Sequence, residues 1–227
     1  MVIVNRSVDL VIFDLDGTLV EFRYRFKEAK ISVLKILAEM GISLSDEALR
    51  KSTQDIFDEI VFQVKRLGSL DLDEVMRRVS EVIDEYEMEA ALTTRLFEDT
   101  LQVLQALKKL GLKLALVTNN GRKATEFMIK KFGLEGFFDA IITRNDGLRL
   151  KPYPDGIKWV LGRFAVSESR AMFVGDSPID VKAGRAAGVV VVALKSTFFG
   201  SKSDLDAEPD YLVDNLSDIL LLVAGRK

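Results

Sequence analysis

Five short apolar runs along the chain stop abruptly at turn-forming or polar residues. The first run reads VDLVIF, is rich in β-branched side chains and ends at Asp14. Because apolar and polar positions do not alternate within these runs, each one predicts a strand that is buried on both faces of a sheet. The predicted strands are residues 8–13, 112–117, 140–143, 171–174 and 189–193.

Segments with apolar residues at helical spacing lie between these strands. We predict helices over residues 100–110, 123–132 and 178–187, each followed directly by a glycine, which commonly marks a helix C-terminus. Buried strands that are separated by helices indicate an α/β fold. The expected architecture is a Rossmann-like parallel sheet with helices on both faces.

The segment from about residue 22 to residue 94 has a different pattern. It contains no strand-like run, and its apolar positions predict three or four amphipathic helices, mainly over residues 25–40, 46–67 and 71–91. Ser45 or Asp46, and Ser69 or Asp71, are suitable N-caps for the second and third helices. We therefore predict two domains: an α/β core, residues 1–20 and 96–227, and an all-helical domain, residues 21–95, inserted after the first strand.

The chain of 227 residues contains no cysteine and no histidine. This composition excludes Ser-His-Asp and Cys-His nucleophiles, disulfide bonds and zinc sites built from these residues. Any catalysis must then use carboxylates, Lys, Arg, Tyr, Ser or Thr. Any metal is expected to be a hard cation that prefers oxygen ligands.

Charged residues are numerous and well mixed, with 32 basic and 35 acidic side chains and a net charge of -3. Such a balance is not typical of proteins that bind nucleic acid through a basic surface. The apolar runs are much shorter than the roughly 20 residues that a membrane span needs, and the first residues do not resemble a signal peptide. We expect a cytoplasmic protein that binds neither nucleic acid nor membrane, as a monomer or homodimer.

Four predicted strands are each followed by residues that could carry chemistry. Parallel strands bring their carboxyl ends to one edge of the sheet, so we expect these groups to converge there. Carboxylates that lie close together repel one another unless a cation joins them, and their oxygens suit Mg²⁺. Mg²⁺ and a lysine can together neutralise a phosphoryl group. The groups are Asp14, Asp16 and Thr18; Thr118 and Asn119; Lys151; and Asp176 and Asp180.

These clusters resemble the four ordered motifs of the haloacid dehalogenase superfamily. The motifs read DLDGT from Asp14, TN from Thr118, KP from Lys151 and GDSPID from residue 175. The helical insertion after the first motif resembles the cap of the phosphoglycolate phosphatase-like branch. The resemblance implies a Mg²⁺-dependent phosphomonoester hydrolase that works through an aspartyl-phosphate and acts on a small phosphate ester such as phosphoglycolate.

The resemblance also implies a role for each matching residue. Asp14 would be the nucleophile, and Asp16 would be the general acid and then the general base. Thr118 and the amide of Asn119 would hold phosphate oxygens. Lys151 would bridge the phosphate and Asp14.

The metal site and the substrate contacts complete this set. Asp176 would bind Mg²⁺ directly, and Asp180 would orient the waters of the metal or Lys151. Gly17 would provide a tight turn that lets backbone amides approach the phosphate. Arg23, just past the first domain boundary, could reach an anionic group of the substrate. The implied metal ligands are Asp14, Asp16, Asp176 and Asp180, with Asp16 acting through its backbone carbonyl.

Structural interpretations of several of these residues remain open. Lys151 alone could be an exposed loop lysine, Asp180 could simply stabilise a helix N-terminus, and Arg23 could lie on a solvated helix face. The residues after the second predicted strand, TNNG, would also suit an ordinary turn. Three aromatic side chains outside the motifs, Phe57, Phe62 and Trp159, are expected in the core.

Alternative functions also remain open. A phosphomutase or pyrophosphatase of the same superfamily would use the same intermediate, although the absence of histidine counts against a β-phosphoglucomutase type of site. The second aspartate of the first motif, Asp16, points away from carbon–halogen hydrolysis, because the founding dehalogenases lack it. A non-catalytic phosphate-responsive binding module is a further alternative, which Asp16 and the long helical insertion disfavour.

Overall fold

The computed structural model describes residues 8–44, 47, 50–195 and 208–224. The chain divides into two compact units. One of them, here called the α/β unit, consists of residues Met1–Phe22 and Thr94–Lys227. The other, here called the helical unit, consists of residues Arg23–Thr93.

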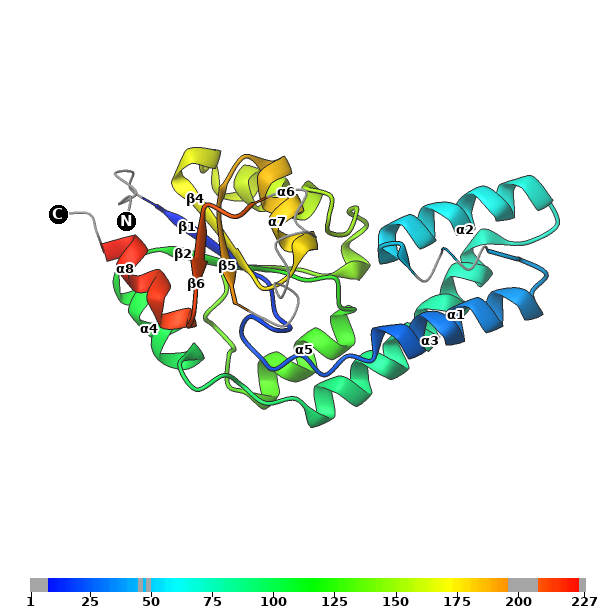
Figure 1. Ribbon diagram of the computed structural model, residues 1–227, viewed down its shortest axis with the longest axis horizontal. Coiled ribbons are helices and arrows are strands. Elements are labelled where there is room, and N and C mark those ends of the chain that lie inside the picture. The colour runs from blue at the N-terminus through cyan, green and yellow to red at the C-terminus, as the bar shows by residue number, and fades with distance from the viewer. Residues whose placement is uncertain (1–7, 45–46, 48–49, 196–207, 225–227) are drawn as a thin grey trace. The chain divides into compact units, whose positions relative to one another are not determined.

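A six-stranded parallel sheet forms the centre of the α/β unit (Figure 1). The strand order is β3-β2-β1-β4-β5-β6, and every neighbouring pair is parallel. The predicted parallel sheet is therefore confirmed, but β6 was not predicted, because its three edge residues do not form a buried run. The strands are β1 (Leu10–Phe13), β2 (Lys113–Val117), β3 (Ala140–Ile142), β4 (Ala171–Gly175), β5 (Val190–Leu194) and β6 (Tyr211–Val213).

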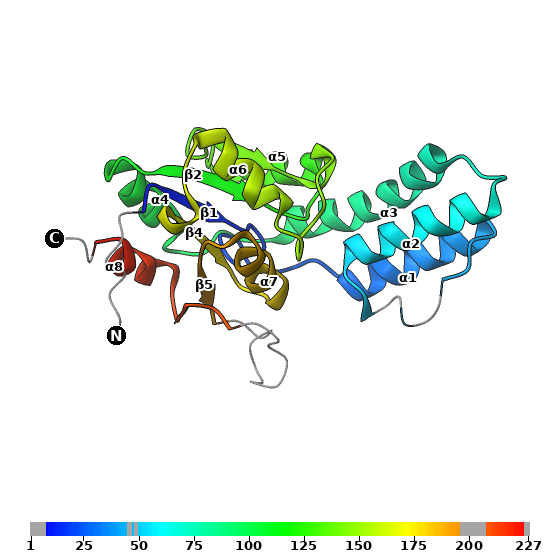
Figure 2. The ribbon, with the colours of Figure 1, turned by 90° about the horizontal axis from the view of Figure 1, so that it is seen from above.

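Helices cover both faces of this sheet (Figures 1 and 2). On one face, apolar side chains such as Ile12 and Phe173 pack in one cluster with Ile157 of α6 and Ala183 of α7. Helix α8 packs against α4. The helices are α4 (Thr100–Lys109), α5 (Arg122–Lys131), α6 (Asp155–Phe164), α7 (Pro178–Ala187) and α8 (Ile219–Ala224), of which α6 and α8 were not predicted.

Three helices form the helical unit: α1 (Phe26–Glu39), α2 (Thr53–Leu67) and α3 (Leu72–Thr93). They enclose a core of their own, which includes Leu37, Ile60 and Val79. The prediction that the second helix begins at residue 46 is wrong. Ser52 and Asp55 form a reciprocal capping box that begins the helix at Thr53, whereas the predicted caps at residues 45 and 46 lie outside the described residues.

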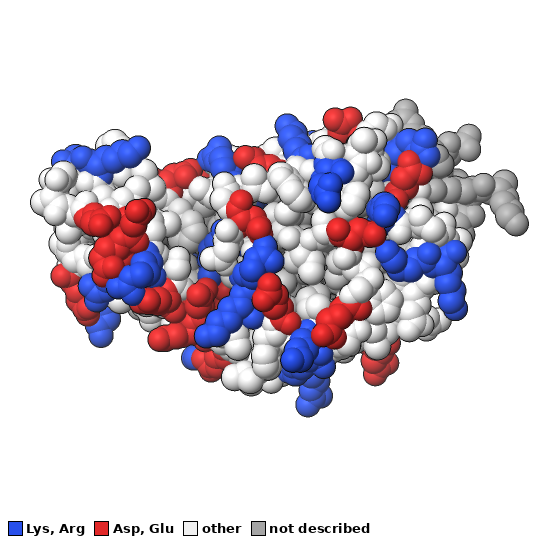
Figure 3. All heavy atoms as spheres, turned by 180° about the vertical axis from the view of Figure 1, so that it is seen from behind, with Lys and Arg blue, Asp and Glu red and all other residues white. Residues whose placement is uncertain are grey.

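The surface differs from the sequence-based expectation at two aromatic residues. Phe62 is 63% exposed and Trp159 is 44% exposed, so the prediction that both belong to the core is wrong. On the face drawn in Figure 3, acidic and basic side chains are interspersed. Within the described part of the chain, no helix has the length and apolar character needed to cross a membrane.

Candidate active site

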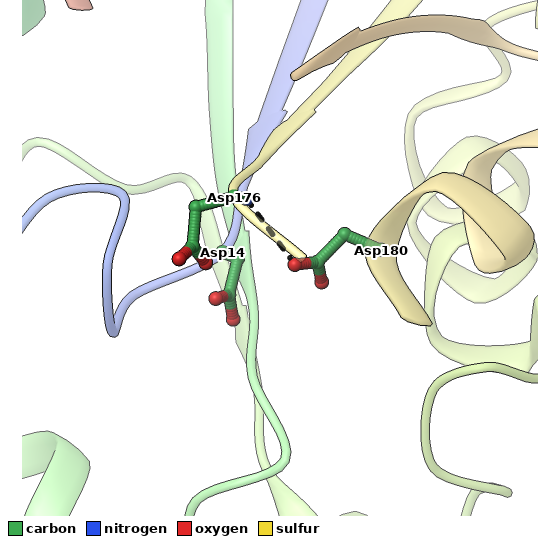
Figure 4. Close-up of side chains that lie close together, drawn as sticks. All are labelled: Asp14, Asp176 and Asp180. Atoms are coloured by element: carbon green, nitrogen blue, oxygen red, sulfur yellow. Dashed lines mark hydrogen bonds between the residues drawn. The ribbon is translucent and has the colours of Figure 1, made fainter. Parts of the chain in front are cut away.

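The carboxyl ends of β1 and β4 bring three buried acidic side chains together. Asp14 follows β1, Asp176 follows β4, and Asp180 lies in the first turn of α7. One oxygen from each carboxylate lies within 4.8 Å of the others, and Figure 4 shows the three groups converging. Because Phe13 pairs with Val174 across these neighbouring strands, the residues that follow each strand begin side by side.

Lys151 supplies a buried positive charge to this cluster. Its Nζ donates a hydrogen bond of 2.5 Å to Asp14 Oδ1 and another of 2.7 Å to Asp180 Oδ1. Burial disfavours the ammonium form, but the two carboxylates outweigh burial and raise the pKa of Lys151. Lys151 therefore stays charged. Its interpretation as an exposed loop lysine is wrong, since the residue is only 4% exposed.

The buried cluster holds three carboxyl groups and one ammonium. With all three carboxyl groups ionised, two negative charges would be uncompensated. Burial raises the pKa of Asp176 to about 9, and the charges of Asp180 and Asp14 contribute. Burial also raises the pKa of Asp14 to about 6, although Lys151 opposes this increase. A divalent cation would offset the excess charge, and the oxygen donors are those that a hard cation prefers, so this set of residues fits such a metal.

Gly17 lets the loop after β1 pass directly against Asp176. Its φ of +81° lies in the left-handed region that side chains disfavour, and a Cβ at this position would lie 2.1 Å from Asp176 Oδ2. Its own amide donates to Val20 O at 2.7 Å. Because Gly17 has no side chain, it leaves room for the carboxylate of Asp176. Its N–H forms a hydrogen bond within the turn.

The loop after β2 holds the backbone of Lys151 in place. The Asn119 side chain donates from Nδ2 to Lys151 O at 3.0 Å and accepts at Oδ1 from Lys151 N at 2.9 Å. The buried Thr118 hydroxyl accepts a hydrogen bond from Asn120 N at 3.1 Å. The side chain of Asn119 is therefore engaged with Lys151, and its backbone amide is the part suited to the predicted phosphate contact.

Asp180 has a structural role as well as a place in the charged cluster. Its Oδ2 accepts hydrogen bonds from Ser177 Oγ at 2.5 Å, Ser177 N at 3.1 Å and Asp176 N at 3.3 Å, while its Oδ1 accepts from Lys151. These bonds include the capping box that begins α7. Asp180 thus connects Lys151 to the loop that carries Asp176.

Sequence reasoning missed two residues that support the loop after β2. Asn120 Nδ2 donates a hydrogen bond to Asp16 Oδ2. The backbone N–H of Arg144 donates to Asn120 O at 2.9 Å, and the Arg144 guanidinium donates to Asn119 O at 3.3 Å. The sequence TNNG could have indicated Asn120, whereas no local pattern indicates Arg144, because its contacts depend on the path of the chain after β3.

A family model described as haloacid dehalogenase-like hydrolase matches residues 11–194, which is most of the chain. The chain belongs to this family. The resemblance inferred from the four motifs is therefore confirmed, and with it the prediction of an enzyme. Enzymes of this superfamily generally use a divalent metal, in agreement with the buried aspartate cluster.

Relatives of this haloacid dehalogenase-like hydrolase match it along nearly its whole length. The phosphoglycolate phosphatase of Haemophilus influenzae is 27% identical over 226 residues, which cover 96% of this chain and 100% of the relative. The pyrophosphatase PpaX of Bacillus anthracis is 26% identical over 229 residues, covering 96% and 97%. The structure of CbbY from Rhodobacter sphaeroides in complex with phosphate has a TM-score of 0.65 at 20% identity, covering 96% and 100%, and shares the fold.

One predicted site residue of this hydrolase does not belong to the unit that carries the others. Arg23 is the first residue of the helical unit, whereas the remaining candidates all lie in the α/β unit. The α/β unit thus brings together Asp14, Lys151, Asp176 and Asp180, with Asp16, Gly17, Thr118 and Asn119 in the adjoining loops.

Proposed function

We propose that this protein is a Mg²⁺-dependent phosphatase that hydrolyses a small phosphomonoester, such as phosphoglycolate, through an aspartyl-phosphate. The observation that carries the proposal is the buried cluster of Asp14, Lys151, Asp176 and Asp180 at the carboxyl ends of the strands. It combines a carboxylate nucleophile, a fixed ammonium and the donors for a divalent cation. Membership of the family, and a relative named phosphoglycolate phosphatase, support the same reaction.

Asp14 acts as the nucleophile, and Asp16 acts as the general acid and then as the general base. In the first step, a carboxylate oxygen of Asp14 attacks phosphorus, the bond to the ester oxygen breaks, and Asp16 gives its proton to the departing oxygen. In the second step, a water oxygen attacks the phosphorus of the aspartyl-phosphate and Asp16 takes the proton of that water. The bond between phosphorus and Asp14 then breaks, which releases phosphate and restores both aspartates.

The other residues would bind the phosphate group and the metal ion during these steps. Lys151, the Thr118 hydroxyl and the backbone amide of Asn119 would bind phosphate oxygens. Asp14, Asp176 and the backbone carbonyl of Asp16 would hold Mg²⁺, and Asp180 would act through Lys151 or through the waters of the metal. When bound, Mg²⁺ supplies positive charge that offsets the phosphate and the excess negative charge of the carboxylates.

We also propose that the helical unit is the cap domain and that the α/β unit is the phosphatase domain. The insertion leaves the α/β unit at Phe22, shortly after Asp16, and returns to it at Thr94. Motion at these two connections would therefore act on the loop that carries the catalytic aspartates. Arg23 at the first connection is the candidate for contact with an anionic group outside the phosphate.

A pyrophosphatase is the second candidate, because the relative of that name matches the chain as completely as the phosphoglycolate phosphatase does. The two activities differ in the leaving group. Pyrophosphate releases a phosphate, which leaves readily, whereas an alkyl ester releases an alkoxide that needs a proton. The same catalytic residues can serve both, so substrate preference must decide between them.

The test is a panel of purified phosphate compounds: a nitrophenyl phosphate, phosphoglycolate, sugar phosphates and pyrophosphate, each assayed for phosphate release with Mg²⁺ or with EDTA. We expect the highest kcat/KM with a small phosphomonoester and loss of activity in EDTA. Asp14→Asn keeps the size of the side chain but removes the nucleophile, and it should lower turnover by about 10³-fold or more. Activity that survives Asp14→Asn would contradict the proposed mechanism, and preference for pyrophosphate would favour the second candidate.

A further inference from the structure

A hydrogen bond between side chains joins the loop after β1, which carries the first motif, to the loop after β2, which carries the second. The Asn120 amide, in the loop after β2, donates from Nδ2 to Oδ2 of Asp16, in the loop after β1. The two residues are 104 positions apart in the sequence, so the contact exists only because β1 and β2 are neighbours in the sheet. None of the roles assigned above uses the Asn120 side chain.

The backbone of Asn120 is itself fixed on both sides. Its N–H donates to the Thr118 hydroxyl at 3.1 Å, and its carbonyl accepts from the N–H of Arg144 at 2.9 Å. The side chain of Asn120 therefore starts from a backbone that cannot shift without breaking one of these bonds. Such support is what a group needs if it is to hold another side chain in one orientation.

We propose that Asn120 is a positioning residue for Asp16, an inference that rests on the proposed phosphatase mechanism. A primary amide donates to a carboxyl oxygen whether or not the other oxygen carries a proton. In a protonated carboxyl group the carbonyl oxygen accepts a hydrogen bond better than the hydroxyl oxygen does, so the amide at Oδ2 directs the proton of Asp16 to Oδ1. Oδ1 is then the oxygen that gives the proton to the leaving group and takes one from water, and Asn120 itself exchanges no proton.

The experiment compares two esters that differ in their need for an acid. An alkyl phosphate releases an alkoxide and depends on the proton of Asp16, whereas a nitrophenyl phosphate releases a stable anion without one. Release of the first leaving group is measured in a single turnover with enzyme in excess over substrate. The proteins are wild type, Asn120→Ala, Asn120→Leu and Asn145→Ala.

Asn145→Ala is the matched control, because Asn145 Oδ1 accepts from Arg122 N at 2.8 Å at the start of α5 and so supports the same segment from another side. We expect Asn120→Ala to slow the alkyl ester by about 10- to 100-fold and the nitrophenyl ester by less than about threefold. Asn120→Leu, which is close to asparagine in size but has no donor, should give the same difference. Asn145→Ala should affect both esters equally.

The outcomes separate this inference from the proposed function. Equal losses on the two esters in the Asn120 variants would overturn the positioning role while leaving the phosphatase assignment in place. If Asn120→Ala does not fold, as judged by circular dichroism, Asn120→Leu decides the question, and wild-type selectivity in that variant also overturns the inference. A wild-type enzyme that hydrolyses neither ester would refute the phosphatase proposal itself, and this inference with it.

Discussion

Replacing Asp176 with asparagine should stabilise the metal-free protein, although Asp176 belongs to the proposed active site. Asp176 is 3% exposed, and one of its oxygens lies within 4.8 Å of oxygens from Asp14 and Asp180. Without a cation, the fold must bury this carboxylate among others of the same charge. Asparagine keeps the size of the side chain and removes that charge, so the folded state no longer has to neutralise it.

The magnitude follows from the repulsion between the carboxylates and from the pKa of Asp176. Two unit charges 4.8 Å apart repel by about 3.5 kcal/mol at an effective dielectric constant of about 20. Burial, together with this repulsion, raises the pKa of Asp176 from 3.8 to about 9 in the folded protein. The folded state then holds a proton that the unfolded state has lost, so stability falls as pH rises above 3.8, by about 1.4 kcal/mol per pH unit or about 4 kcal/mol at pH 7. Relaxation of the site reduces both figures, and we expect a gain of about 2–4 kcal/mol.

The assay is thermal unfolding in EDTA at several pH values, followed by tryptophan fluorescence. Trp159 is the single tryptophan of the chain and lies in α6, so its signal reports on the α/β unit. At pH 7 the midpoint of Asp176→Asn should exceed that of wild type by roughly 5–10 °C. The difference should shrink toward pH 4. Excess Mg²⁺ should stabilise wild type, by about 2.7 kcal/mol at 100 times its Kd, and should stabilise the variant much less.

Asp180→Asn is the matched comparison, because it makes the same chemical change in the same cluster. Asp180 accepts hydrogen bonds from Lys151, from Ser177 and from the N–H of Asp176. Its replacement therefore weakens the capping box of α7 and leaves Lys151 with one carboxylate fewer, so this variant should be less stable than wild type in EDTA. The reasoning is refuted if Asp176→Asn is destabilised in EDTA, or if both variants change stability in the same direction.

Two further predictions concern the turn after β1 and the start of β3. Gly17→Ala should lower both stability and activity much more than Gly41→Ala. Both glycines have φ near +80°, but of the two only Gly17 faces a side chain, that of Asp176. Equal effects of the two substitutions in denaturation and activity assays would contradict this. Asp139→Asn should lower the free energy of unfolding by about 1–2 kcal/mol at pH 7. Partial burial raises the pKa of Asp139, but hydrogen bonds from Leu114 N and from two lysines lower it below 3.8 overall, so this stabilisation is present above pH 3.8 and is lost as pH falls below that value. Urea denaturation at pH 7 and pH 3 checks it, and a difference that does not shrink between pH 7 and pH 3 would argue against the ion pairs.

The buried strands could be predicted because burial on both faces makes a strand apolar throughout. β1 and β4 are fully buried along their length, and both were found from their apolar runs. β6 is short and lies at the edge of the sheet, where one side chain, Leu212, is 50% exposed, so no such run forms. α6 contains Gly156 and Gly162 within ten residues, which weakens the helical pattern.

The residues at the strand ends could be predicted because parallel strands bring their carboxyl ends to one edge. This rule suffices to bring Asp14, Asp176 and Lys151 together, and they do meet in the structure. The rule does not predict which side-chain and backbone atoms form hydrogen bonds with one another. The side chain of Asn119 binds the backbone of Lys151, and that of Asn120 binds Asp16, because of the way the loop turns after β2. Such choices depend on the conformation of the loop and have no signature in spacing or composition.

The contacts of Lys151 show that the site depends on the order of the strands in the sheet. Its Nζ is shared by Asp14, which follows β1, and Asp180, which lies after β4, while its backbone is held by Asn119, which follows β2. These contacts require β2, β1 and β4 to be neighbours, as they are in the sheet. The helical unit is inserted between β1 and β2 in the sequence and leaves this order intact. A chain without histidine or cysteine can therefore assemble a site for phosphoryl transfer from carboxylates, one ammonium, amides and a hydroxyl.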